Sequence, residues 1–201
     1  MSKFIAGGCS FTFGHELSDD EQGKIPSKKS WAYGLKTGPP DEYICTAYPG
    51  SGNPGIARRV FNAVANNTDI KCVVVMWSFL SRYDWAMPRH KALEGTRWTS
   101  ISPWDTNSGN EEAFRSLAGS EPQQEQWRTR RDTFAETGVK PFAEAIYKHA
   151  ANQYHETYLS WKSIIWLQNI LEKKKIPFMF TLATTPCSTM SSNSTRTKIH
   201  S

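Results

Sequence analysis

The sequence has no long hydrophobic run. Its longest apolar stretches, such as residues 72–77, are far shorter than the roughly 18–20 residues that a membrane-spanning helix needs. The amino-terminal residues carry one lysine and only a short apolar stretch, which is too little for a secretory signal peptide. We therefore expect a cytoplasmic protein that has no membrane partner.

Cysteine is sparse and follows no metal-binding pattern. The chain has four cysteines, and no two of them form the C-x-x-C pair that is typical of zinc sites. Residues 7–14 begin and end with glycine as a phosphate-binding loop does, but His15 and Glu16 stand where that loop needs lysine and then serine or threonine. The glycine spacing also fails the dinucleotide-binding fingerprint. The sequence therefore predicts no metal, no disulfide framework and no cofactor.

Positive charge is in only small excess over negative charge. The chain has 24 Lys and Arg against 19 Asp and Glu, a formal net charge of +5. The basic residues are scattered, and their longest run, residues 173–175, follows a helical pattern at a position where cations stabilise a helix C-terminus. Nucleic acid is therefore not expected as a partner.

The apolar content is sufficient for one folded domain. The chain has 201 residues, of which 38% are hydrophobic and 21% charged, and this composition excludes wholesale disorder. We expect strands near residues 3–7, 43–48, 72–77 and 178–182, separated by helical patterns. The unbroken apolar run of the third strand is typical of a parallel strand covered on both faces. The predicted fold class is a three-layer α/β domain with a parallel sheet.

Two segments depart from this alternation. Residues 84–140 are mixed and polar, and we interpret them as an irregular insertion over one edge of the sheet. Residues 184–201 are rich in serine and threonine and are predicted to be an unfolded tail, which leaves 1–183 as the folded domain. Four of the eight tryptophans of the chain fall in the insertion, namely Trp85, Trp98, Trp104 and Trp127.

The strongest helical periodicity lies in residues 141–173. Large residues recur there at alternating steps of four and three, which predicts that this stripe faces the core. The stripe consists of Tyr147, Ala151, Tyr154, Tyr158, Trp161 and Ile165. His149 and His155 lie off the stripe and are interpreted as ordinary helix residues.

Ser10 follows the first strand directly, after Gly7, Gly8 and Cys9. A serine there lies at the carboxyl end of a parallel strand, the edge where open α/β sheets place their ligand sites. Backbone N–H groups at the start of a following helix can stabilise a developing oxyanion. Ser10 is therefore a candidate nucleophile, although the same segment also fits a tight turn in which Ser10 only caps a helix.

Two motifs resemble the SGNH/GDSL hydrolase family. Gly8-Cys9-Ser10-Phe11-Thr12 is similar to block I, in the variant from tailed phages and bacteria that has cysteine in place of the usual aspartate, and Ser51-Gly52-Asn53 is similar to block II. The resemblance implies a flavodoxin-like, doubly wound sheet and hydrolysis of a small-molecule or carbohydrate ester. It also implies that Ser10 is the nucleophile, that the N–H groups of Ser10 and Gly52 hold the oxyanion, and that a phage-encoded chain would associate with the virion.

The resemblance covers about residues 1–85 and 141–183, and it fails at block III. The family has an asparagine after the third strand as a third oxyanion donor, whereas this chain has no asparagine there. Ser78, Ser81 and Arg82 are candidates for this donor, and Asn53 is a further candidate cleft residue. The alternative is that Arg82 and Asp84 form a solvated loop pair.

The family's Asp-x-x-His motif is also absent. The chain has no aspartate after Asp132, so the base that activates Ser10 is unassigned. His15 and His200 are the two candidates. Either the chain lacks the last strand and helix of the family, or it binds a ligand without hydrolysing it. In the second case it would be a carbohydrate- or protein-binding module that uses the tryptophans of residues 84–140.

Overall fold

A computed structural model describes residues 2–15, 17–19, 24–36, 38, 42–87, 98–106 and 121–183, without the side chains of residues 121–124, 126 and 127. The predicted tail at 184–201, with His200, lies outside the described residues. The elements in chain order are β1 (Lys3–Gly7), α1 (Ser10–Phe13), α2 (Trp31–Gly34), β2 (Glu42–Cys45), α3 (Asn53–Ala65), β3 (Ile70–Trp77), β4 (Tyr83–Ala86), β5 (Trp98–Ile101), the 3-10 helix η2 (Pro103–Asp105), α5 (Glu121–Glu136), α6 (Val139–His149), α7 (Gln153–Lys173) and β6 (Phe178–Leu182).

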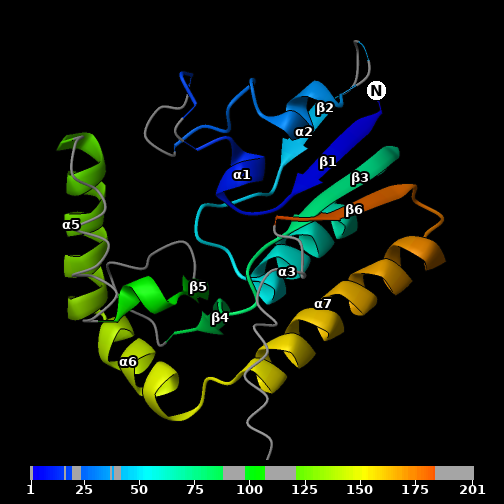
Figure 1. Cartoon of the computed structure of the whole chain (residues 1–201). Helices are drawn as coiled ribbons and strands as arrows, with labels where there is room; N and C mark the ends of the chain where they lie inside the picture. Colours follow the sequence, from blue (N-terminus) through cyan, green and yellow to red (C-terminus); the bar gives the residue numbers. More distant parts are fainter. Residues whose placement is uncertain are drawn as a thin grey trace, which may run out of the picture.

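The centre of the molecule is a four-stranded sheet with the order β2-β1-β3-β6 (Figure 1). All three strand pairs are parallel, which confirms the predicted parallel sheet. The strands predicted at residues 3–7 and 178–182 have those bounds, whereas β2 ends at Cys45 rather than at residue 48. Beyond the last pairing of β2, the chain turns toward the loop that precedes α3.

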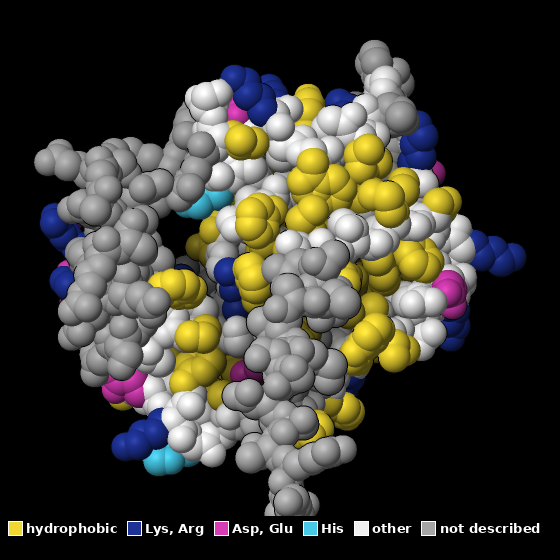
Figure 2. All heavy atoms as spheres, viewed as in Figure 1, with side chains coloured by type: hydrophobic (Ala, Val, Ile, Leu, Met, Phe, Trp, Pro, Cys, Tyr) yellow, Lys and Arg dark blue, Asp and Glu magenta, His cyan; other side chains and the backbone are white. Residues whose placement is uncertain are grey.

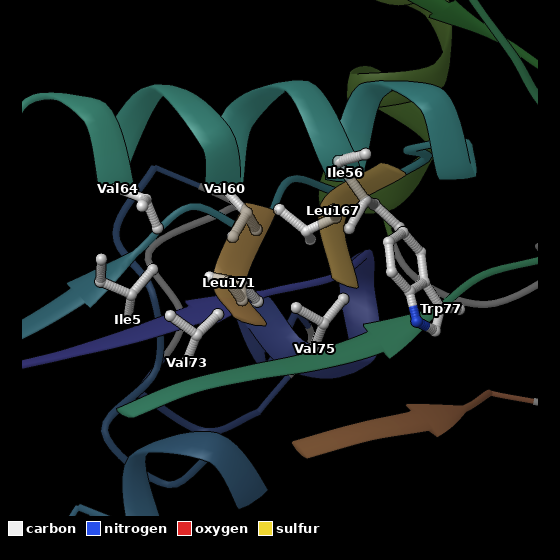
Figure 3. Packing of buried hydrophobic residues seen from close by; sticks show 10 residues of the cluster. Ile5, Ile56, Val60, Val64, Val73, Val75, Trp77, Leu167 and Leu171 are labelled. Atoms are coloured by element: carbon white, nitrogen blue, oxygen red, sulfur yellow. The ribbon is translucent and has the colours of Figure 1, made fainter. Parts of the chain in front are cut away.

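Helices cover both faces of this sheet. On one face, α3 and α7 pack on alternate residues of β1 and β3, and Figure 3 shows Val60 and Leu167 pointing toward Val73 and Val75. On the other face, Ala32 of α2 packs in a smaller cluster with residues of β1 and β3. The chain is therefore a mixed α/β protein with a parallel sheet between helices, as the unbroken apolar run of β3 predicts.

The described part of residues 84–140 is regular rather than irregular, so that expectation is wrong for it. β4 and β5 form an antiparallel pair, and α5 and α6 pack beside them through a second apolar cluster. The cluster contains Tyr83, Met87, Ile101, Phe134, Val139 and Ala143. The buried carboxylate of Asp105 fixes α5 against η2 by accepting two hydrogen bonds from Arg130, at 2.7 and 3.0 Å.

The long helix predicted at residues 141–173 is two helices. α6 ends at His149, and α7 begins after Asn152, whose side-chain oxygen accepts a hydrogen bond from the backbone N–H of His155 at 2.9 Å. Asparagine is a strong helix N-cap because its side chain satisfies an otherwise unpaired N–H group. The helical periodicity runs across this break, so the hydrophobic pattern does not reveal it.

The prediction that the aromatic stripe faces the core is confirmed for Tyr147 and Ala151, which pack against the second apolar cluster, and is wrong for the part of the stripe on α7. Tyr154, Tyr158, Trp161 and Ile165 are 90%, 61%, 58% and 51% exposed. The face of α7 that packs inward instead consists of Ser160, Ser163, Leu167 and Leu171. Ser160 and Ser163 are small, and the hydroxyl of Ser160 accepts a hydrogen bond from Asn53 of α3 at 3.0 Å, so α7 lies close to the start of α3 at this point. Figure 2 shows hydrophobic side chains exposed over the part of the view where β6 and α7 lie.

Among the helices of the described residues, none combines the length and apolarity that a bilayer crossing requires.

Candidate functional site

Three segments singled out in the sequence meet at the carboxyl edge of the sheet. β1 leads into the Ser10 turn, β3 leads into residues 78–82, and α3 begins beside both of them (Figure 1). The carbonyl of Gly8 accepts a hydrogen bond from the N–H of Tyr48 at 3.2 Å, which joins the Ser10 turn to the loop before α3. Gly52 lies so close to Arg82 that a Cβ atom at this position would overlap the Arg82 carbonyl. Glycine is therefore required at position 52 by close backbone packing.

Ser10 is the first residue of α1, and Cys9 is its N-cap residue. The alternative that Ser10 caps the helix is therefore wrong. Ser10 is half-buried, and its hydroxyl makes no hydrogen bond to the part of the chain that the structure describes. The turn needs glycine at position 8, because a Cβ there would overlap the side chain of Thr12. The hydroxyl of Ser10 thus lies at the sheet edge and has no hydrogen-bond partner among the residues that the structure describes.

The backbone N–H groups of Ser10 and Gly52 both lack a hydrogen-bond acceptor among the described residues. Both N–H groups belong to the start of a helix, where the first N–H groups have no carbonyl acceptor within the helix. Both donors are therefore available to an acceptor that does not belong to the described chain, such as an oxyanion.

Arg82 reaches back from the loop after β3 to the Ser10 turn. Its Nη1 donates a hydrogen bond to the hydroxyl of Ser78 at 2.9 Å, and its guanidinium lies over the ring of Phe79 at 4.8 Å. Burial lowers the pKa of Arg82, and the neighbouring thiol of Cys9 acts in the opposite direction. The side chain of Arg82 therefore lies beside the turn that carries Ser10, the candidate nucleophile.

The alternative of a solvated pair between Arg82 and Asp84 is wrong. The carboxylate of Asp84 is buried and accepts hydrogen bonds from Arg58 at 3.0 and 3.2 Å. It also accepts one from Ser100 at 3.3 Å, and it packs directly against Gly55. Asp84 therefore attaches the β4–β5 pair to α3. Arg82 instead contacts Ser78 and Phe79.

Asn53 is fully buried, and its side chain is engaged inside the protein. Its amide nitrogen donates to the carbonyl of Ser78 at 3.2 Å and to the hydroxyl of Ser160 at 3.0 Å, and its oxygen accepts from the N–H of Ser78 at 2.7 Å. Both amide hydrogens are thus used by the fold. Asn53 acts on the site by holding Ser78, which in turn contacts Arg82. Sequence reasoning missed Ser160, whose only signal is a small polar residue on the inward face of α7.

Arg59 is a second residue that sequence reasoning missed. It donates from Nε to the carbonyl of Thr46 at 2.9 Å and from Nη2 to the hydroxyl of Ser51. Burial lowers its pKa to about 10. These hydrogen bonds fix the loop between β2 and α3, which carries Gly52. No sequence pattern distinguishes Arg59 from its neighbour Arg58.

The histidines differ in their relation to Ser10. His15 follows Gly14, the left-handed C-cap residue of α1, and its backbone N–H donates to the Ser10 carbonyl at 3.0 Å. His149 is exposed at the end of α6, and His155 stacks on Tyr83 with ring centroids 6.4 Å apart. Among the described histidines, His15 is thus the one that a hydrogen bond joins to Ser10.

Ser81 contributes its backbone rather than its hydroxyl. Its carbonyl accepts a hydrogen bond from the hydroxyl of Tyr147 at 2.6 Å, which connects α6 to the loop that carries Arg82.

Within the described residues, no group of three or more His, Cys, Asp or Glu side chains could hold a metal ion. In comparisons with known proteins, no family model and no curated sequence matches the chain.

Proposed function

We propose that the chain is an SGNH-type serine ester hydrolase in which Ser10 attacks the carbonyl of a small-molecule or carbohydrate ester. One observation carries this proposal: the Ser10 hydroxyl and the N–H groups of Ser10 and Gly52 lie on adjacent βα turns and make no hydrogen bond within the described residues. These are the donors that a tetrahedral oxyanion needs. The strand order β2-β1-β3-β6 also fits a flavodoxin-like, doubly wound sheet.

In this mechanism the Ser10 oxygen bonds to the ester carbon while a base takes the hydroxyl proton. The two N–H groups stabilise the negative charge on the former carbonyl oxygen, and the alcohol leaves with the proton. Water then hydrolyses the acyl-serine by the same route. The residue that acts as this base is unassigned, and His15 is the candidate among the described residues. Because a serine without a positioned base is a weak nucleophile, we expect slow turnover.

A fluorophosphonate probe tests this proposal, because it reacts covalently with activated serines. We expect labelling of the wild-type chain, loss of labelling in Ser10→Ala, and unchanged labelling in Ser18→Ala. Ser18 is the matched control because it is exposed and bonded only to Lys29 in the described chain. Equal labelling of all three proteins, or labelling of none, would reject Ser10 as the nucleophile.

A second candidate function is binding without hydrolysis. Trp85, Trp98 and Trp104 are 47%, 43% and 39% exposed on β4, β5 and η2. Indole rings stack on sugar rings and also serve as anchors in protein interfaces. Arg58 already covers one face of Trp98, at 4.3 Å from its ring centre, so Trp104 is the better test residue. Glycan-array binding that persists in Ser10→Ala and disappears in Trp104→Ala would favour this function.

A further inference from the structure

Arg82 differs from two other partly buried arginines in the way its charge is balanced. Arg58 and Arg130 each donate two hydrogen bonds to a buried aspartate, Asp84 and Asp105. Arg82 instead donates to the neutral hydroxyl of Ser78 and lies beside the thiol of Cys9. No carboxylate of the described residues forms an ion pair with it.

Neutral partners orient a guanidinium without cancelling its charge. The ring of Phe79, at 4.8 Å, supports one face of the Arg82 group, and the Ser78 hydroxyl fixes one of its nitrogens. Burial is the largest influence on the pKa of Arg82 and lowers it, whereas the neighbouring Cys9 and Tyr147 raise it and Arg130 lowers it. A partly buried cation without a counter-ion is costly unless a bound anion completes it. Among the described residues, Ser78 and Cys9 are the side-chain partners of the Arg82 guanidinium, so its other N–H groups are available there for such an anion.

We propose that Arg82 binds an anionic group, a carboxylate or a phosphate, on the ester that Ser10 hydrolyses. This inference rests on the proposed function, because it names the substrate class of the same site. The planar guanidinium matches both anions through paired N–H donors. Arg82 touches the Ser10 turn through Cys9 and the Gly52 turn through its backbone, so the bound anion lies near the reacting carbonyl.

Binding can be measured without hydrolysis in the Ser10→Ala background. Isothermal titration calorimetry would use succinate and inorganic phosphate, with neutral succinamide as the comparison. We expect one or both anions to bind, and Arg82→Gln to weaken binding at least about tenfold, because charge-assisted hydrogen bonds are lost. Lys174→Gln removes an equal charge at the opposite edge of the sheet and should leave binding within about twofold. The two anions distinguish a carboxylate from a phosphate ligand.

Absence of binding by both anions, or equal binding in Arg82→Gln, would overturn the proposal. Circular dichroism checks the fold of each variant. If Arg82→Gln does not fold, Ser78→Ala is the substitute, because it removes the hydroxyl that orients Arg82 but keeps its charge. Ser78→Ala should weaken anion binding several-fold, and unchanged binding there would count against the proposal.

Hydrolysis supplies the second measurement. We compare 4-nitrophenyl acetate with the 4-nitrophenyl monoester of glutarate, which carries a free carboxylate. Arg82→Gln should raise KM for the anionic ester at least about tenfold and change KM for the acetate less than about threefold. An equal loss of kcat on both esters would show that Arg82 acts on the oxyanion, and would overturn the proposal. If the wild type hydrolyses neither ester, the role of Ser10 fails, whereas calorimetry still decides the role of Arg82.

Discussion

The amide of Asn53 shows how a single buried side chain holds the candidate site together. It joins the start of α3 to the end of β3 through Ser78 and to α7 through Ser160. Because Ser78 also accepts a hydrogen bond from Arg82, the position of the guanidinium depends on a residue that it does not contact. The family resemblance marks position 53 as part of a motif, and the structure supplies a packing reason for the asparagine.

Asn53→Ala should lower the free energy of unfolding by about 2–4 kcal/mol, because the buried groups of Ser78 and Ser160 lose their partners. Urea denaturation followed by circular dichroism measures this loss. Asn62→Ala, an exposed asparagine on the same helix, is the control and should change the stability by less than about 0.5 kcal/mol. Similar small effects of both substitutions would contradict the role assigned to Asn53.

At the scale of elements, α7 shows that periodicity identifies a helix but not its buried face. Two stripes run along α7: a large aromatic one and a smaller one with two serines and two leucines. The smaller stripe faces α3 and the sheet, with Leu167 and Leu171 fully buried. Because Asn53 bonds to Ser160, α3 and α7 lie close together at this point, and a bulky ring would not fit there. On α7, the aromatic stripe therefore does not mark the buried face of the helix.

A pair of substitutions on α7 tests this assignment of its faces. Leu167→Ala should lower the free energy of unfolding by about 2–5 kcal/mol, since it opens a cavity in the core between α3 and the sheet. Trp161→Ala removes a larger side chain but should cost less than about 1 kcal/mol, because that side chain is 58% exposed. Urea denaturation measures both. A larger loss for Trp161→Ala would contradict the observed faces.

At the scale of the whole molecule, one buried and two half-buried tyrosines link stability to alkaline pH. Burial is the main cause that raises the pKa of Tyr43, Tyr83 and Tyr147, and the carboxylate of Glu156 adds to the shift at Tyr83. A tyrosine whose pKa is raised by folding keeps its proton in the native state at a pH where the unfolded chain loses it. Stability from these groups is therefore complete below about pH 10 and falls at higher pH.

Tyr83→Phe should reduce this alkaline loss. The pKa of Tyr83 is raised to about 12, so its contribution to stability disappears between about pH 10 and that value. The stability difference between the wild type and Tyr83→Phe should therefore shrink over this range. Arg59, whose pKa is lowered, has the opposite pH dependence but is present in both proteins. Urea denaturation at a series of pH values tests the prediction, and a difference that stays constant would contradict it.

Local patterns were sufficient to locate several strands and the Ser10 turn. β1 and β6 have the predicted bounds because apolar runs between breaking residues are a short-range signal. Gly8 was identifiable as the end of the first strand, whereas Gly52 was singled out only by the resemblance to block II; a Cβ at position 8 would overlap the Thr12 side chain, and one at position 52 would overlap the Arg82 carbonyl. In contrast, the break between α6 and α7 and the regular structure of residues 98–106 carry no periodic signal, and the sequence did not reveal them.

The sequence by itself determined an α/β chain with a parallel sheet, and it placed Ser10 and Gly52 at the ends of local elements, because turns and strand patterns depend on neighbouring residues. Tertiary structure alone decided which partners these residues have. It separated Arg82 from Asp84, assigned Asp84 to Arg58, and placed the guanidinium of Arg82 beside Cys9. Charge pairing and burial depend on contacts between segments far apart in the chain, and no local pattern encodes those contacts.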